Sequence, residues 1–397
     1  MSMPSTNAST PPMPERDRRW SLVAAIASVT VFGLSVGQSA PLLPLLLEHR
    51  GTGTTLNGLN AGVTFIGVII GPLLSPAMVR RFGIRRVLLA CFGLDITLFL
   101  AMKASDSIAG WFVLRPLLGI VGSSIFTTGE AWINQLAGDA GRGRIIGIYA
   151  AALSAGFGAG PLVLSLTGID GWPPFLVNAS ISALAMLPLL AVGEESQGFA
   201  RESGTGPLRM FACAPAIVGA AAAFGLYESA LMSLLPVWGV RSGLTERLAA
   251  ATLSSVYFGS IGLQVLIGWL SDGVSRLAAL RLCGAVGLVG AATLLWVPAA
   301  PLALFGLLFV WGGVASGIYP VALSMAGDRF RGGDLVTVNA AIVIAYGLGA
   351  LTGPPIGGAA MDIRNPQGLL WVFVLLFAGL LMGTTVITDR SPPPGTE

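Results

Sequence analysis

Long apolar stretches separated by short polar ones run along the whole chain. Twelve of them are long enough to cross a bilayer, which takes about 20 helical residues at about 1.5 Å each. Gly and Pro, 54 and 25 in the chain, are frequent inside them, and helices in lipid tolerate both because neighbouring helices satisfy the freed backbone groups. The pattern therefore predicts an all-α polytopic membrane protein with 12 transmembrane helices, at residues 22–47, 57–79, 87–104, 109–137, 145–168, 173–193, 211–238, 248–271, 277–298, 302–326, 335–360 and 368–388.

The composition excludes a soluble globular protein. The chain is 54% hydrophobic and 10% charged, with a mean hydropathy of +0.80, whereas soluble proteins carry about 25% charged residues. In water such a chain would expose large apolar patches, which soluble monomers avoid. We therefore expect a lipid bilayer around the protein and no nucleic-acid partner.

Arginines concentrate between the predicted spans, most densely in the stretch PAMVRRFGIRRVLL (76–89), where four lie within seven residues. Of the 22 lysines and arginines, 16 fall on one side of the predicted membrane, five on the other, and Arg115 within a span. Positive charge accumulates in cytoplasmic loops. Both termini are therefore predicted to be cytoplasmic.

The chain also contains an internal repeat. The segment GFGAGP (Gly156–Pro161) aligns with GALTGP (Gly349–Pro354) at an offset of 193, LAGD at 136 aligns with MAGD at 325, and Pro44 aligns with Pro236. Three nearly equal offsets, 193, 189 and 192, predict two parallel six-helix pseudo-repeats around a central cavity, with the substrate site between them near the middle of the bilayer. The predicted parts are a disordered cytoplasmic tail (1–19), an N-terminal bundle (20–193), a cytoplasmic linker (194–210), a C-terminal bundle (211–390) and a cytoplasmic tail (391–397).

Residues for metal or cofactor chemistry are sparse. Cys91, Cys213 and Cys283 lie in or beside spans without metal-ligand spacing, and the single histidine, His49, lies at a helix end. The glycine-rich GFGAG at 156–160 lies inside an apolar span with no βαβ context, so it does not predict a nucleotide loop. We expect no metal, no cofactor and no enzymatic activity.

Several of these motifs resemble those of the major facilitator superfamily of secondary transporters. The stretch GPLLSPAMVRRFGIRR is similar to the family's loop between helices two and three, with Arg80 at the position of an acid, and RPLLGIVG resembles the fourth-helix signature through Arg115. The second half keeps the loop pattern in GWLSDGVSR, whose Asp272 lies 192 residues after Arg80. The resemblance implies gating loops at Arg80, Arg81, Gly83, Arg85, Arg86, Gly268, Asp272 and Arg276.

The element GALTGPPIGG is similar to one that family exporters carry, usually in helix five, whereas helix five here keeps only part of it. The resemblance implies helix hinges at Gly156, Gly160, Pro161, Gly349, Gly353, Pro354, Gly357 and Gly358. Membership of the family also implies a monomer in a bacterial inner membrane, and the stretches ASGIYPVALSMAGDRF and GEAW resemble those of a bacterial subgroup of mostly unassigned substrate. In the family fold, helices one, four, seven and ten line the cavity, which gives as candidate liners Gln38, Arg115, Glu130, Tyr227, Glu228, Met232, Trp311 and Tyr319.

Ionisable groups inside the spans are the candidates for mechanism, because such groups are costly in a membrane. They are Asp95, Arg115, Glu130 and Glu228, of which Asp95 is expected to serve packing, because the family resemblance places it on a supporting helix. Arg115 and Glu130 share a face of one helix but are separated by a rise of about 22 Å. Glu228, near the middle of its span, suits a proton carrier. The alternative for Glu130 and for Glu228 is a structural role, as a protonated acid bonded to a neighbouring helix.

Three functions remain open: a secondary transporter driven by protons, a sensor or scaffold on the same fold, and a membrane enzyme. The lack of a catalytic constellation disfavours the enzyme, and the retained membrane charges disfavour the scaffold. Gly-Pro elements in both halves favour export of a small molecule by antiport, with uptake by symport as the alternative. Because Arg80 replaces an acid, we also expect an inner gate that opens readily to the cytoplasm.

Overall fold

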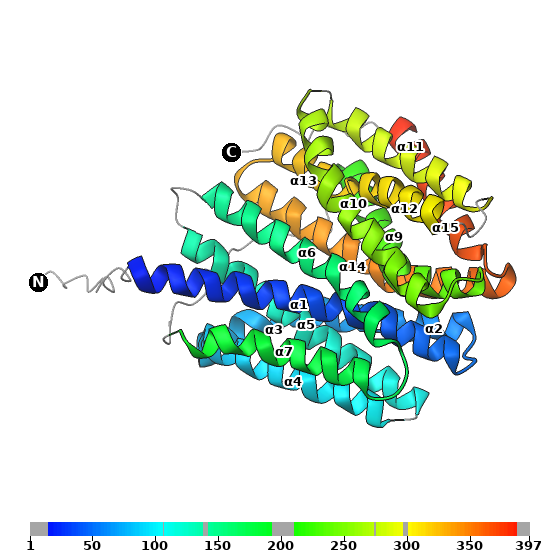
Figure 1. Cartoon of the computed structure of the whole chain (residues 1–397). Helices are drawn as coiled ribbons and strands as arrows, with labels where there is room; N and C mark the ends of the chain where they lie inside the picture. The colour runs from blue at the N-terminus through cyan, green and yellow to red at the C-terminus, as the bar shows by residue number, and fades with distance from the viewer. Residues whose placement is uncertain are drawn as a thin grey trace, which may run out of the picture.

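The computed structural model describes residues 15–105, 107–137, 142–192, 210–273, 275–296 and 301–386, and all regular structure within these ranges is α-helical (Figure 1). Twelve spans are long and apolar enough to cross a membrane, so the predicted number is confirmed. The helices are α1 (Glu15–His49), α2 (Thr54–Gly62), α3 (Thr64–Phe82), α4 (Ile84–Ala104), α5 (Ile108–Ala137), α6 (Arg142–Thr167), α7 (Pro173–Leu190), α8 (Met210–Cys213), α9 (Pro215–Arg241), α10 (Glu246–Gly273), α11 (Arg276–Leu294), α12 (Pro301–Ala315), α13 (Ile318–Arg329), α14 (Gly332–Ile363) and α15 (Gly368–Val386).

Two of the spans are each made of two helices. The second span is interrupted at Val63, between α2 and α3, and the tenth at Ser316 and Gly317, between α12 and α13. One boundary of the predicted parts needs correction, since α1 begins at Glu15 and residues 15–19 are helical. Residues 1–14, the linker up to 209 and the predicted C-terminal tail lie outside the described residues.

Each half of the chain has its own hydrophobic core. One large core consists of residues between Met210 and Phe377, and two smaller ones come from the first half, with Ala250 as the exception. In Figure 1, α1, α4 and α7 lie in the lower part of the molecule and α9, α11 and α12 in the upper part. The described chain is therefore two helical bundles side by side.

Equivalent helices form the tightest pair in each bundle. Gly156 of α6 lies against the carbonyl of Thr30 in α1, and Gly349 of α14 lies against the carbonyl of Ala222 in α9. At both positions an added Cβ would collide with the partner backbone. Small residues permit this close approach of helices in lipid, and it explains why the two Gly-Pro segments recur at one offset.

The helices run up and down, so the molecule has two ends. We call the end that holds the start of α1, the α3–α4 turn at Gly83 and the start of α11 at Arg276 the arginine-rich end. The opposite end, which we call the closed end, holds the turn between α1 and α2 and the turns between α9 and α10 and between α14 and α15.

Candidate functional site

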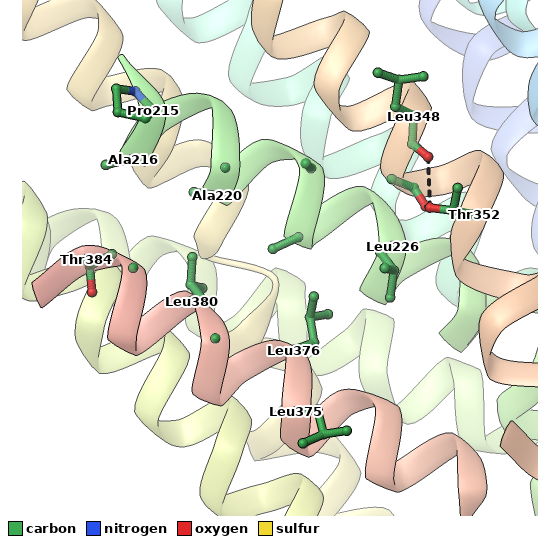
Figure 2. A pocket seen from close by; sticks show the side chains of 16 residues that line it. Pro215, Ala216, Ala220, Leu226, Leu348, Thr352, Leu375, Leu376, Leu380 and Thr384 are labelled. Atoms are coloured by element: carbon green, nitrogen blue, oxygen red, sulfur yellow. Dashed lines mark hydrogen bonds between the residues drawn. The ribbon is translucent and has the colours of Figure 1, made fainter. Parts of the chain in front are cut away.

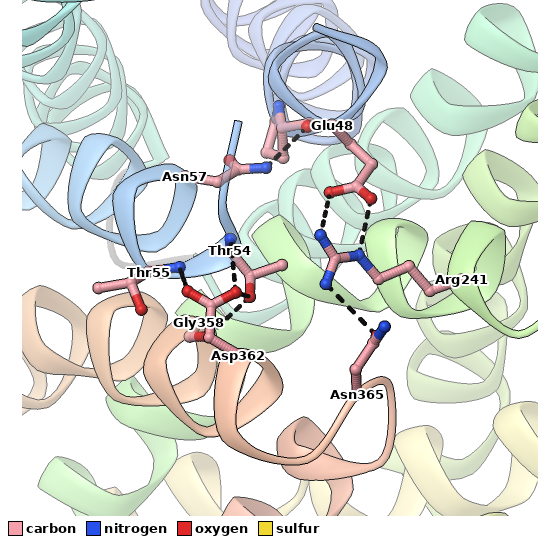
Figure 3. A network of polar contacts seen from close by, with 9 residues as sticks. Glu48, Thr54, Thr55, Asn57, Arg241, Gly358, Asp362 and Asn365 are labelled. Atoms are coloured by element: carbon pink, nitrogen blue, oxygen red, sulfur yellow. Dashed lines mark hydrogen bonds and ion pairs between the residues drawn. The ribbon is translucent and has the colours of Figure 1, made fainter. Parts of the chain in front are cut away.

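A polar network joins the two halves at the closed end (Figure 3). The Arg241 guanidinium at the end of α9 donates two hydrogen bonds to the Glu48 carboxylate at the end of α1, from Nε to Oε1 at 2.7 Å and from Nη2 to Oε2 at 3.0 Å. Its Nη1 donates to Asn365 Oδ1 at 3.3 Å. Nearby, His49 Nδ1 lies 3.1 Å from Glu246 Oε1.

In the same network the start of α2 is capped by the other half. Gly53, which precedes α2, provides no side-chain cap. The carboxylate of Asp362 in α14 accepts hydrogen bonds from the backbone amides of Thr54 and Thr55 at 3.0 and 2.9 Å, and from the Thr54 hydroxyl. A carboxylate at a helix N-terminus is favoured by the unpaired amides and the helix dipole. Docking of the two halves therefore completes the first turn of α2.

Beside this network, glycines allow the backbones of α2 and α14 to approach each other closely. Gly58 lies against the carbonyl of Pro354, and Gly358 lies against the carbonyl of Thr54, so that a Cβ on either glycine would collide with the other half. Of the predicted hinge residues, Pro354 and Gly358 thus lie at the contact between the halves. Gly353 and Gly357 face α9, and Gly160 faces α1, which makes these contacts internal to one bundle.

At the arginine-rich end, the contacts described for the gating-loop residues lie within their own half. Arg85 Nη2 donates to the carbonyl of Leu190 at 3.1 Å, and Arg81 lies over the Phe82 ring. In the second half, Arg276 pairs with Asp328 at 3.0 Å. Gly83 forms the α3–α4 turn with φ +81, and Arg80 and Arg86 are exposed. Gly268 faces open space. The Asp272 side chain and the acids of the linker lie outside the described residues.

Glu228 lies in the middle of α9 and is half-buried. Its Oε2 accepts a hydrogen bond from the hydroxyl of Tyr346 in α14 at 2.8 Å. One turn before it on α9, the Phe224 ring packs against Tyr346 and against Tyr319 of α13, with centroids 6.2 and 5.5 Å apart, and the two tyrosines lie 5.6 Å apart. A carboxyl group and three aromatic rings from three helices therefore form one cluster.

The first half contributes a second acid to this region. Glu130 of α5 is half-buried, and its charge and that of Glu228 both act on the Tyr319 hydroxyl. Phe157 of α6 stacks on Tyr257 of α10 with centroids 5.7 Å apart. One acid from each half therefore acts on the same tyrosine, and the stacked rings of Phe157 and Tyr257 also join the two halves.

Arg115 is buried in the first half without its full complement of partners. Its side chain is 6% exposed, and no described residue accepts from Nε or Nη2. Its neighbours on α5, Pro116 and Gly119, pack against Gly67 and Thr64 of α3. Buried polar groups are nearly always hydrogen-bonded, so these two nitrogens are exceptions to the rule.

Three predicted cavity liners lie inside the bundles instead. Gln38 is fully buried, donates to the carbonyl of Pro174 at 2.8 Å and accepts from Asn178 at 2.9 Å. Trp311 is also fully buried and donates to the carbonyl of Gly287, while Tyr227 packs edge-on against it. Both faces of a membrane helix can be apolar, so the sequence does not separate its core face from its cavity face.

Other members of the site were missed because they lie outside the four helices that the family resemblance pointed to. They are Phe157 of α6, Tyr257 of α10 and Tyr346 of α14. The chain has only five tyrosines, and their rarity inside apolar spans could have marked Tyr257 and Tyr346 as candidates. Of the other predicted members, Met232 is half-buried on α9, and Pro161 lies inside α6.

A separate cavity of about 650 Å³ lies between α9, α14 and α15 (Figure 2). Its lining is apolar apart from Thr352 and Thr384, and the Thr352 hydroxyl already donates to the carbonyl of Leu348 at 3.0 Å. Gly349 is the one predicted site residue in its lining. The cavity therefore offers no polar recognition and is distinct from the Glu228 cluster.

Comparison with known proteins agrees with this architecture. The family described as Major Facilitator Superfamily matches residues 22–318 and 251–397. The curated protein "Uncharacterized MFS-type transporter YfkF" of Bacillus subtilis (strain 168) is 24% identical over 387 residues, which cover 95% of this chain and 97% of that protein.

Solved structures share the fold at low sequence identity. The nucleoside transporter NupG superposes with a TM-score of 0.76 at 13% identity, over 94% of this chain and 100% of that one. A D-xylose–proton symporter superposes with a TM-score of 0.72 at 15% identity, over 94% of this chain and 98% of that one.

Proposed function

The chain belongs to the Major Facilitator Superfamily, and on that premise we propose that it exports a small molecule across the bacterial inner membrane in exchange for protons. The observation that carries the proposal is a pair of half-buried acids inside the spans, Glu130 of the first half and Glu228 of the second, whose charges act on one tyrosine, with Glu228 hydrogen-bonded to Tyr346 of α14. An acid in such a place can bind a proton on one side of the membrane and release it on the other as the bundles rock.

The asymmetry of the two ends supports alternating access. Contacts at the closed end cross between the halves, through Glu48 with Arg241 and through Asp362 with α2. Those described at the arginine-rich end, such as Arg276 with Asp328, stay within one half. We assign the arginine-rich end to the cytoplasm by the positive-inside rule. A molecule whose halves are joined at the opposite end suits an exporter, which loads its substrate from the cytoplasm.

Uptake by symport is the second candidate, because the D-xylose–proton symporter has the same fold. The two directions differ in the gradient that drives accumulation. An antiporter accumulates substrate on the side with more protons, whereas a symporter accumulates it on the side with fewer.

The test is transport by the purified full chain in proteoliposomes with an imposed pH gradient, screened against a panel of small metabolites and drugs. We expect accumulation of the substrate in vesicles that are acidic inside, and its loss when the gradient is collapsed with a protonophore. Accumulation in vesicles that are alkaline inside would establish symport. Substrate binding without any gradient-driven flux would indicate a sensor.

A further inference from the structure

Three of the five tyrosines of the chain lie around one acid, Glu228 of α9. Tyr346 of α14 donates a hydrogen bond to it, and its charge acts on the hydroxyls of Tyr257 in α10 and Tyr319 in α13. Three helices therefore present tyrosines to a single carboxyl group on a fourth.

The rings beside Glu228 include accessible surface. Tyr319, Tyr346 and Tyr257 are half-buried, and the Phe224 ring packs beside the first two. The face of an aromatic ring carries negative potential and attracts cations within about 6 Å of its centroid. A carboxylate ringed by such faces is the chemistry that recognises an organic ammonium group.

Within the described residues, no counter-ion is built into this cluster. The hydrogen-bond partner of the Glu228 carboxylate there is the neutral Tyr346 hydroxyl. The seven described arginines of the second half lie at or near the ends of its spans, and the described charged group that acts on the cluster from the first half is another acid, Glu130. Arg115 is about 22 Å along α5 from Glu130. An anionic ligand would thus meet two acids.

We propose that Glu228 and the rings of Phe224, Tyr319 and Tyr346 bind an organic cation, a protonated amine or a quaternary ammonium, as the substrate of this transporter. The inference rests on the proposed function and names its substrate class. The cation and the proton occupy the same carboxyl group in turn. When the cation binds, the Glu228 proton leaves to water in the space between the halves, and when the cation leaves, a proton returns to Oε1 or Oε2.

Two shape-matched ions of opposite charge test the inference on the purified full chain in nanodiscs. The probes are tetraphenylphosphonium and tetraphenylborate, with benzyltrimethylammonium as a smaller cation. We expect one or both cations to bind at pH 8 and tetraphenylborate not to bind at Glu228. Binding should release one proton per cation into weakly buffered solution, and it should weaken as the pH is lowered to 5.

Variants separate the carboxylate from the rings. Glu228→Gln should weaken cation binding at least tenfold and abolish proton release. Asp95→Asn is the matched control, because Asp95 is also an acid inside a span but accepts a hydrogen bond from Ser182 within the first bundle; binding should be unchanged. Tyr319→Leu should weaken binding by about threefold to thirtyfold, the range of a cation–π contact, and Tyr319→Phe should retain it.

The outcomes divide between the two proposals. Cation binding that is unaffected by Glu228→Gln, or equal binding of tetraphenylborate, would overturn the cation site. Gradient-driven transport of neutral or anionic compounds alone would also overturn it and leave the proposed antiport standing. Binding with proton release at Glu228 but no flux in proteoliposomes would support the site and refute the proposed transport function.

Discussion

The ion pair of Glu48 and Arg241 joins two positions that are equivalent in the internal repeat, since their numbers differ by 193. That is the offset between the two Gly-Pro segments. Their side chains are 16% and 19% exposed, so solvent and salt screen this pair less than a surface pair. Each partner belongs to a different bundle, and the pair can break when the bundles separate without disturbing either core.

We expect Arg241→Gln to favour states that are open at the closed end, because the variant removes both charge-assisted bonds to Glu48. A loss of about 1.4 kcal/mol would change the ratio of states about tenfold. Distances between spin labels at Asp170 and Thr245, measured by double electron–electron resonance in a cysteine-free background, would report the change. The exchanged pair Glu48→Arg with Arg241→Glu should recover the original distances. A swap that opens the closed end further would show that the pair is no latch.

Arg115 should be dispensable for stability but not for transport. Its buried guanidinium has no described acceptor at Nε or Nη2, and an unpaired buried charge is destabilising. We therefore expect Arg115→Met to leave the melting temperature in detergent unchanged or higher while transport is lost. Arg115→Lys, which keeps the charge, is the control and should retain part of the transport. A fall of several degrees for Arg115→Met would mark Arg115 as structural.

For individual residues, the sequence predicts charged members of the site better than neutral ones. Glu228 and Arg115 stand out because charge is rare inside spans. Gln38 and Trp311 look equally suitable for a cavity, yet they satisfy their polar atoms inside a bundle, through Pro174 and Gly287. Which neighbour a neutral side chain reaches depends on helix packing, and hydropathy alone does not contain that information.

Among the elements, α2 is the one whose structure depends on the other half. Its N-terminus takes its cap from Asp362, and Gly58 in its middle touches the backbone of α14 at Pro354. The bend at Val63 separates α2 from α3. These features make α2 the movable part of the closed end.

Gly58→Ala should open the closed end without unfolding the protein. The added methyl group would collide with the carbonyl of Pro354, and separation of the halves relieves the collision at no cost to either bundle. Gly306→Ala is the matched control, because a Cβ there meets nothing within 4 Å. Labelling of an engineered cysteine at Asn60, which is buried in the closed state, should speed up in Gly58→Ala alone. Equal labelling rates in both variants would contradict this role of α2.

Hydropathy locates the spans but not the helix ends. The apolar stretch predicted from residue 22 continues backward as helix to Glu15, because charged residues at a helix end can extend beyond the bilayer. Conversely, the interruptions at Val63 and Gly317 leave no mark in a pattern that stays apolar throughout. Both depend on contacts with other helices, which a single-sequence pattern does not encode.

For the whole molecule, orientation is the first quantity to test. With the arginine-rich end in the cytoplasm, an engineered cysteine at the exposed Asp170 should react with an impermeant thiol reagent in intact cells, and one at the exposed Arg86 should react only after permeabilisation. The cause is the excess of arginine on one side. Reaction at Arg86 in intact cells would invert the topology, and with it the direction assigned to transport.

The two ends of the molecule differ in whether a carboxylate caps the N-terminus of a helix. At the closed end, Asp362 of one half caps α2 of the other. At the arginine-rich end, α14 begins at Gly332 without a side-chain cap, and Arg80 occupies the position where the family resemblance implies an acid. Among the described residues, a carboxylate of one half caps a helix of the other at the closed end alone.

Arg80→Asp should supply the missing latch. The introduced carboxylate would be attracted to the uncapped start of α14 and to Arg331 beside it, whereas the arginine is repelled by both. We expect closure of the arginine-rich end, seen as shorter distances between spin labels at Arg86 and Ala278, with a change in the state ratio of about tenfold for about 1.4 kcal/mol. Arg80→Gln removes the repulsion without adding a carboxylate and should have a smaller effect. Equal shifts in both variants would assign the effect to lost repulsion, and unchanged distances in Arg80→Asp would leave Arg80 as a topology anchor alone.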